Sequence, residues 1–151
     1  MLIYEKSCHG LYYDDLQKTK HYFSLAIQTL ELIVDCFSGE LLYAIGYFPL
    51  IRAKKSVILL PKCKGFGFVF DKKIKENATP SVAYNFEDFF PKSKQIFTSE
   101  NLFYDKEVGI IKYGKDNYLT FRHIKINDNL CIAVNADNEI QCLYIKPDKF
   151  I

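Results

Sequence analysis

The fold is decided by the stretch LELIVDCFSGELLYAIGY, residues 30–47. In residues 30–35, Leu30, Leu32 and Val34 occupy every second position, separated by Glu31 and Ile33. The run of residues 41–47 is apolar and aromatic. Between the two runs, Gly39 tolerates the positive φ that a tight turn needs. Because β-branched and aromatic residues are enriched from 33 to 47, the stretch predicts a β-hairpin, which Pro49 ends.

Upstream of this hairpin, the pattern fits two structures. Apolar residues between 16 and 37 also recur at the spacing of one helix face, with Gly39 in the place of a C-terminal cap. Strand-forming residues favour the hairpin from 33 onward. For residues 16–28, both helix and strand stay open.

Downstream, short strands and turns continue at regular spacing. We expect strands at 56–60 and 66–70, a loop at 71–80, and a helical turn at 86–90 that Pro91 ends. Strands at 108–113 and 118–126 flank 114–117, which has the composition of a four-residue hairpin loop. A last hairpin is predicted from 130–134 and 139–145, with a turn at 135–138.

The first and last hairpins are alike in sequence. LELIVD at 30–35 parallels LCIAVN at 130–135, and each returns through a glutamate toward a proline. This likeness fits either a structural repeat or two unrelated hairpins built by the same turn chemistry. The whole pattern predicts a mainly β fold, or an α+β one. Antiparallel hairpins would form a sandwich or strongly curved sheet with at most one or two short helices.

Length and composition indicate one domain, residues 1–151, with a proper core. Apolar residues make up 49% and charged residues 25%, which excludes a disordered chain. The net charge of +2 argues against general nucleic-acid binding as the function. Five cysteines without zinc-like spacing, a start unlike a signal peptide and no membrane-spanning run favour a reduced, cytoplasmic protein.

No catalytic constellation is evident. Cys8 and His9 are adjacent, and neighbours on a strand point to opposite faces, so they make a poor nucleophile–base pair. Nucleophile-elbow, zinc-protease and phosphate-loop motifs are all missing from the sequence. We therefore expect no enzyme, metal site, cofactor or small-molecule substrate.

One short stretch resembles the central signature of RNA-recognition motifs. Residues 64–70 read KGFGFVF, against the family pattern K/R-G-F/Y-G/A-F-V-x-F/Y. The resemblance implies that Phe66 and Phe68 share one open sheet face on which RNA bases stack. Phe70 comes one residue before the last aromatic position of that signature, where this chain has Asp71. The interpretation we adopt is a core strand that buries Phe66 and Phe68, with RNA binding as the alternative function.

A second resemblance covers more of the chain. The hairpin at 34–49 and the ending at 139–147 are similar to strand pairs of small β-rich immunity proteins. Those proteins neutralise toxins of bacterial contact-dependent inhibition and polymorphic toxin systems. The resemblance implies tight binding of one cognate toxin and occlusion of its active site. Inhibitors of nuclease toxins are often acidic, so this slightly basic chain predicts either another kind of toxin or a local acidic surface.

Two stretches combine aromatic and acidic side chains and form the predicted partner-binding surface. Aromatic residues provide the contact area of binding hot spots, and carboxylates steer association with a basic cleft. The alternative is that the aromatic side chains lie in the core and the carboxylates in solvated turns. The predicted residues are Tyr12, Tyr13, Asp14, Asp15, Glu87, Asp88 and Phe90.

Overall fold

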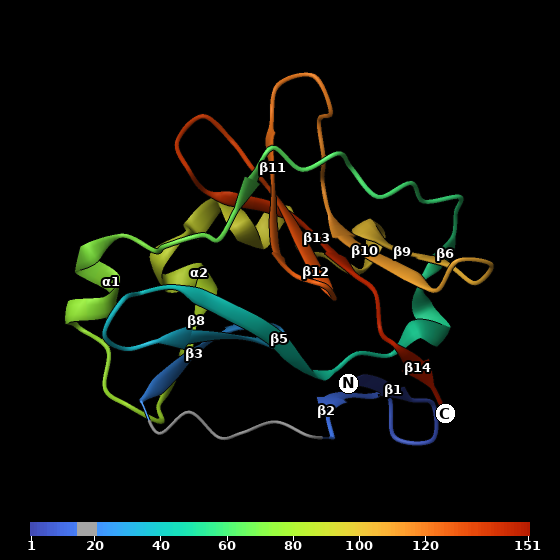
Figure 1. The fold of residues 1–151 in the computed structure, drawn as a ribbon, viewed down its shortest axis with the longest axis horizontal. Helices are drawn as coiled ribbons and strands as arrows, with labels where there is room; N and C mark the ends of the chain where they lie inside the picture. Colours follow the sequence, from blue (N-terminus) through green and yellow to red (C-terminus); the bar gives the residue numbers. More distant parts are fainter. Residues whose placement is uncertain (15–20) are drawn as a thin grey trace.

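Two β-sheets face each other in a sandwich, which confirms the mainly β prediction (Figure 1). The computed structural model describes residues 1–14 and 21–151. In order across the first sheet, the strands are β14 (Lys149–Phe150), β1 (Leu2–Glu5), β2 (Gly10–Tyr13), β5 (Leu41–Tyr47), β4 (Leu30–Asp35), β3 (Tyr22–Ile27) and β8 (Ala83–Asn85). Those of the second sheet are β6 (Lys54–Lys55), β9 (Leu102–Asp105), β10 (Ile110–Gly114), β13 (Ile140–Ile145), β12 (Leu130–Val134), β11 (Arg122–Asn127) and β7 (Gly65–Phe66).

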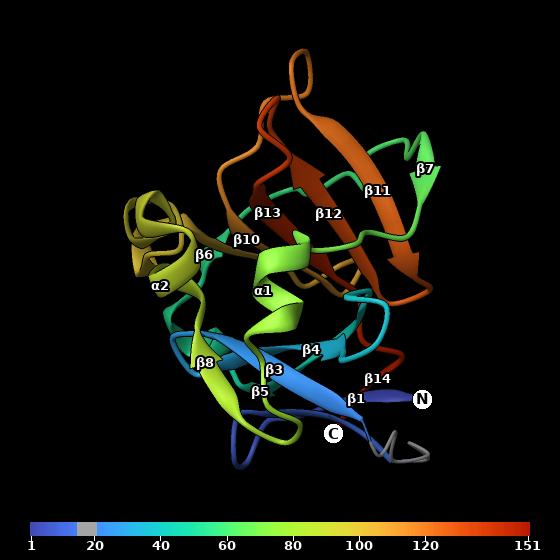
Figure 2. The same ribbon diagram turned by 90° about the vertical axis from the view of Figure 1, so that its left-hand side faces the viewer.

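Helices are few and short. The described residues hold α1 (Lys72–Glu76), α2 (Phe86–Phe89) and the 3-10 turns η1 (Leu50–Arg52), η2 (Pro91–Gln95) and η3 (Ser99–Asn101). Figure 2 shows α1 in front of the space between the sheets, where its Ile74 joins the core. Among the described residues, no helix has both the length and the apolar character that crossing a bilayer needs.

The first and last of the predicted hairpins are confirmed. β4 and β5 pair antiparallel, as do β12 and β13. The helical turn at 86–90 is confirmed as α2, which ends before Pro91. For the region where helix and strand stayed open, the structure has β3 over 22–27, and residues 15–20 lie outside the described part.

Four local predictions are wrong. Residues 56–60 form no strand, and of the strand expected at 66–70 only Phe66 lies in one, as the second residue of β7. The expected loop at 71–80 contains α1, because the Asp71 side chain accepts a hydrogen bond from the backbone N–H of Lys73 (2.8 Å) and caps the helix. The loop at 114–117 does not close a hairpin, since β10 pairs with β9 and β13 while β11 pairs with β12 and β7.

The likeness of the two hairpins reflects a structural repeat that is longer than the sequence comparison indicated. β1–β5 and β9–β13 have the same order in their sheets, and Leu2 pairs with Tyr13 as Leu102 pairs with Tyr113. The bulge before Val34 in the β4–β5 pair recurs before Val134 in the β12–β13 pair. The strand after each five-strand unit pairs parallel with the other unit: β6 with β9, and β14 with β1.

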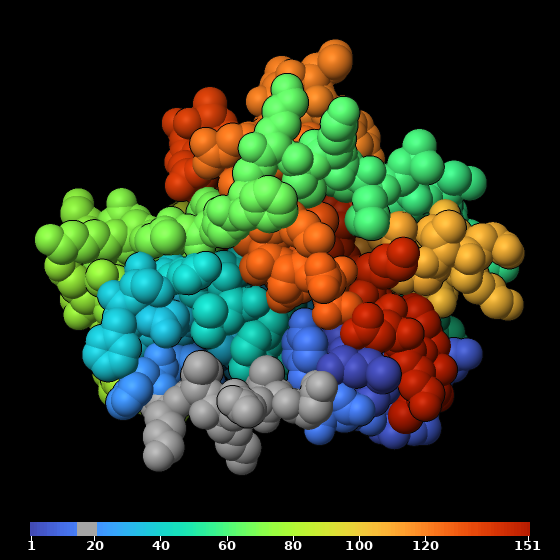
Figure 3. Space-filling model, in the orientation of Figure 1, coloured from blue at the N-terminus to red at the C-terminus, as the bar shows by residue number. Residues whose placement is uncertain are grey.

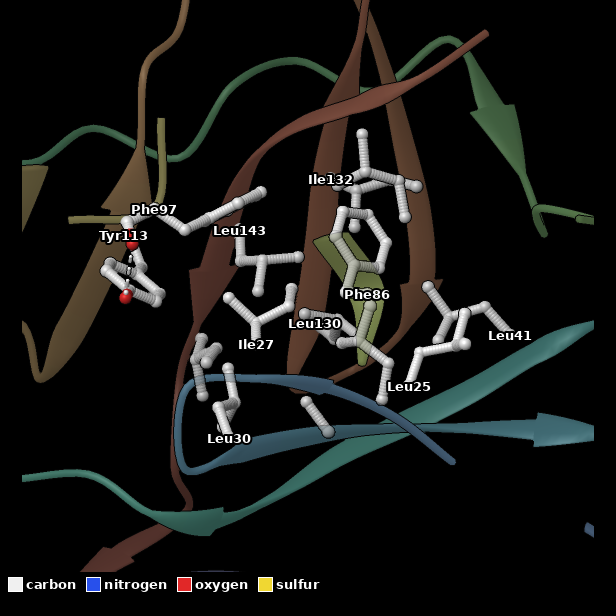
Figure 4. Packing of buried hydrophobic residues seen from close by; sticks show 14 of the residues in the cluster. Leu25, Ile27, Leu30, Leu41, Phe86, Phe97, Tyr113, Leu130, Ile132 and Leu143 are labelled. Carbon is white, nitrogen blue, oxygen red and sulfur yellow. Dashed lines mark hydrogen bonds between the residues drawn. The ribbon is translucent and has the colours of Figure 1, made fainter. Parts of the chain in front are cut away.

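The main core lies between the sheets (Figure 4). Leu25 and Leu30 come from the first sheet and Ile132 and Leu143 from the second, and all four are buried. Each such side chain stabilises the fold by about 1.5–3 kcal/mol. A smaller cluster covers the outer face of the second sheet and includes Ile58, Ala133, Cys142 and Tyr144.

Candidate functional site

The first predicted stretch lies on β2 and just after it. The Tyr13 hydroxyl donates to Oδ1 of Asn129 (3.2 Å), and the Asp14 carboxylate is 3.4 Å from the N-terminal ammonium group. Tyr12 is partly exposed, and Asp15 lies outside the described residues. Tyr13 thus links β2 to the turn between β11 and β12, and Asp14 links it to the first residue of the chain.

The second predicted stretch is α2 and the residue that follows it. Glu87 and Asp88 are exposed, whereas the Phe90 ring packs 4.6 Å from that of Phe86 and 6.2 Å from that of Phe70. α2 contacts β3 and β8, and three strands (β5, β4 and β3) separate β2 from β8. The structure does not bring the two stretches together into one surface.

The stretch that resembles the RNA-recognition signature is not a continuous strand. Gly67 has a φ of +80°, and the chain turns there, so Phe66 and Phe68 do not share a face. Phe68 is 5% exposed and packs edge-on against Phe70, which confirms Phe68 as a core residue. Phe66 is 84% exposed, so its predicted burial is wrong.

The segment that leads into this stretch crosses the second sheet from edge to edge. We call residues 54–66 the strap: β6 begins it beside β9, and β7 ends it beside β11. Ile58 fixes the strap to the outer face, with its side chain buried and its N–H donating to Oδ2 of Asp105 (2.9 Å). In Figure 3 the strap, in green, lies across the upper part of the molecule beside the loop that joins β10 to β11.

The strap exposes apolar side chains on both sides of this anchor. Val57 is 87% exposed, Leu59 75%, and Leu119 of the adjacent β10–β11 loop 96%. Exposed apolar groups that gather on one face are typical of interaction surfaces. From Arg52 to Phe66 the chain also has five basic residues and no acidic one. We call this basic, apolar surface the strap face.

Beneath the β10–β11 loop, next to the strap face, lies a buried polar network. The Asp116 side chain is 0% exposed, and Nε2 of His123 lies 2.9 Å from both its carboxylate oxygens. The Tyr144 hydroxyl donates to the same carboxylate and lies 3.0 Å from the hydroxyl of Tyr118. The Tyr118 ring stacks on the His123 ring at 5.7 Å. Asp116 therefore fixes the orientation of the histidine.

Burial sets the protonation of the neighbouring groups. It raises the pKa of Tyr144 far above the ordinary value of 10.0, and the hydrogen bond to Asp116 raises it further. Burial, followed by the charge of Asp116, raises the pKa of the Cys142 thiol to about 12. Tyr144 therefore stays a hydrogen-bond donor, and Cys142 stays an unreactive thiol at neutral pH.

A lysine contributes a positive charge to the same region. Nζ of Lys112 lies 5.8 Å, 5.6 Å and 5.8 Å from the ring centroids of Phe103, Tyr118 and Tyr144. Ring faces attract such a cation, which holds the ammonium group beside the two tyrosine rings of the polar network.

A pocket of about 350 Å³ opens between the strap and the β10–β11 loop. Basic side chains form part of its wall, and His123 lies at its inner end. Its lining residues are Pro61, Lys62, Lys64, Tyr118, Leu119, Phe121, Arg122 and His123. Among the described residues, no group of three or more His, Cys, Asp or Glu side chains is placed to hold a metal ion.

Among the described residues, the strand side chains of the polar network have no counterparts of the same type in the first sheet. By strand register, the first sheet has Tyr12, Ser24 and Ile45 where the second has Lys112, His123 and Tyr144. The fold therefore forms without these polar groups at equivalent positions. Sequence reasoning missed the network because Asp116 lies in the loop expected at 114–117, and no sequence pattern pairs it with His123.

The free cysteines allow a direct test of the burial described above. Cys8 is exposed, and the hydrogen bond to the Glu5 carboxylate (2.8 Å) raises its pKa. The pKa of Cys142 near 12, against an ordinary 9.0, lowers its thiolate fraction roughly a thousandfold at pH 8. With iodoacetamide and no reductant, we expect mass spectrometry to find Cys8 modified first and Cys142 only after unfolding. Fewer than five modified cysteines in the unfolded chain would contradict the prediction of reduced thiols.

No protein-family model matches the chain, and no curated protein is significantly similar to it in sequence. The strap face is thus a candidate site on the strength of its own geometry.

Proposed function

We propose that this protein binds one partner protein tightly and inhibits it, as an immunity protein does with its cognate toxin. The observation that carries the proposal is the strap face, where Val57, Leu59 and Leu119 are each at least three-quarters exposed. Solvent contact at such side chains is unfavourable, and a partner relieves it by covering them. The resemblance to immunity proteins of bacterial toxin systems adds the class of partner and the cytoplasm as the place of action.

Charge favours an acidic rim on the partner. Lys55, Lys62 and Lys64 are exposed along the strap, and Arg122 lines the pocket together with Lys62 and Lys64. Complementary charges speed association and disfavour wrong partners. The proposed toxin surface is therefore apolar at its centre and acidic at its edge, instead of the basic cleft expected from the sequence.

The strap also keeps RNA binding as a second candidate function. Phe66 is exposed beside Lys64, an arrangement that suits stacking of one base next to a phosphate contact. Phe68 and Phe70 are buried against each other, so the aromatic platform of the RNA-recognition signature is lost. Inhibition of a protein partner uses more of the exposed surface and is the function we prefer.

Co-expression with a candidate toxin domain taken from a neighbouring gene tests the proposal. We expect protection by the natural chain and its loss with Val57→Glu plus Leu59→Glu, which should weaken the complex by at least about thirtyfold. Phe37→Glu is the matched control, because Phe37 is 70% exposed on the β4–β5 turn of the other sheet.

A second arm separates the strap face from the surface predicted from sequence. Reversing the charges of Asp14, Glu87 and Asp88 should leave protection intact if the strap face binds the toxin. If these reversals abolish protection while the strap variants keep it, the acidic residues and not the strap face bind the toxin. If the natural chain neither protects nor forms a complex at micromolar concentration, the proposed function is wrong.

A further inference from the structure

We infer that the pocket beside His123 binds a phosphate group, carried either by a small phosphate ester or by an RNA backbone. This inference does not depend on the identity of a protein partner. It rests on three features of the pocket: unpaired cations at the wall, a buried histidine with one free nitrogen, and a network that holds this histidine in place.

The wall of the pocket has cations without acidic partners. Among the described residues, neither Lys62 nor Lys64 has a carboxylate within 4.0 Å. The Arg122 guanidinium donates one hydrogen bond to Oδ1 of Asn138 (2.8 Å), which leaves most of its N–H groups for a ligand. Lys62, Lys64 and Arg122 all line one cavity of about 350 Å³.

The inner end of the pocket presents a single nitrogen. His123 is 8% exposed, and its Nε2 is committed to Asp116. Nδ1 has no hydrogen-bond partner among the described residues. Because no fully buried side-chain N or O atom there lacks a partner, Nδ1 keeps some exposed surface, and His123 lines the pocket. For Nδ1 to donate a hydrogen bond to a phosphate oxygen it must carry a proton, and His123 is then an imidazolium between two anions.

The groups around the imidazole suit that charge. Asp116 faces Nε2, and Tyr144 donates to Oδ2 of the same carboxylate. Tyr118 covers one face of the ring, and Lys112 lies on aromatic rings nearby. The histidine is therefore oriented before the ligand arrives, which removes part of the entropic cost of binding.

The number of donors favours phosphate over a carboxylate. A carboxylate has two oxygens and one charge, whereas a phosphate monoester offers three terminal oxygens and up to two charges. Lys62, Lys64, Arg122 and protonated His123 together match the larger anion.

The test is a titration followed by ¹⁵N NMR of the full chain with inorganic phosphate, uridine 5′-monophosphate and a single-stranded oligouridine. Phosphate is expected to bind with a Kd of about 1 mM and to give both His123 nitrogens the shifts of protonated, donor-type imidazole. A tighter complex with the mononucleotide would assign the pocket to small phosphate esters. Tightest binding by the oligonucleotide, weakening as salt is added, would assign it to RNA.

Lysine variants provide the control. Lys62→Gln plus Lys64→Gln should weaken phosphate binding at least tenfold. Lys54→Gln plus Lys55→Gln removes the same charge from the strap outside the pocket and should leave phosphate binding unchanged. Equal weakening by both pairs, or no change of the His123 signals at about 20 mM phosphate, would overturn the inference. The Val57→Glu plus Leu59→Glu variant should retain phosphate binding even if it no longer binds the toxin. Each of the two proposals can therefore be contradicted without the other.

Discussion

Replacing Phe68 with alanine is expected to lower the free energy of unfolding by about 3–5 kcal/mol. The ring is 5% exposed and packs 5.0 Å from the ring of Phe70, and its backbone carbonyl accepts a hydrogen bond from Leu41 (2.9 Å). Truncation leaves a cavity between the strap's end and the core that rigid strands do not refill. At this chain length the loss corresponds to a melting temperature lower by roughly 10 °C or more, measurable by calorimetry and urea unfolding.

Phe66→Ala is the matched control for that change. Phe66 has the same side chain two residues away and is 84% exposed, so its removal should cost at most about 0.5 kcal/mol. Equal destabilisation by the two variants would show that the turn at Gly67 does not separate an inner from an outer phenylalanine.

The second large effect is expected for Gly114→Ala at the end of β10. Gly114 has a φ of +111°, and a Cβ there would overlap the carbonyl oxygen of Gln141 and lie 3.0 Å from Cα of Cys142. Both neighbours are backbone of β13, which is paired on each side and has no room to move. We expect a loss of about 3 kcal/mol or more from strain and overlap together.

Gly65→Ala tests whether this loss is specific. Gly65 has nothing within 4 Å of an added Cβ and no positive φ, so alanine there should change stability by less than about 0.5 kcal/mol. Urea denaturation of both variants measures the difference. A Gly114→Ala protein as stable as the Gly65→Ala protein would contradict the close approach of β10 to β13.

Only part of the candidate site could be predicted from the sequence. Asp14, Glu87 and Asp88 are exposed, as carboxylates in turns and short helices usually are, but strand order places β2 and α2 apart. The residues that do meet, Asp116 and His123, were both visible in the chain. Their contact depends on a loop folding back onto β11, and no local pattern reports it.

The repeat had a signal that was overlooked. LIYEK at 2–6 and LFYDK at 102–106 share a leucine, a tyrosine, an acid and a lysine at a separation of 100 residues. These segments become β1 and β9 with the turns that follow them. Combined with the two hairpins, this motif predicts the whole repeat, because equivalent sequence at equivalent spacing builds the same unit twice.

Local sequence patterns were enough to predict the strands at 30–35, 41–47, 130–134 and 140–145, because the alternation of apolar residues and the turn residues act over a few positions. They were insufficient for the strap, where Val57, Ile58 and Leu59 have a strand's composition but lie across a sheet face. Tertiary structure alone decided the exchange of β6 and β14 between the repeats, the separation of Phe66 from Phe68, and the meeting of Asp116 with His123. Each depends on contacts between segments that are brought together only when the two sheets pack, and the free energy of that packing outweighs local preference.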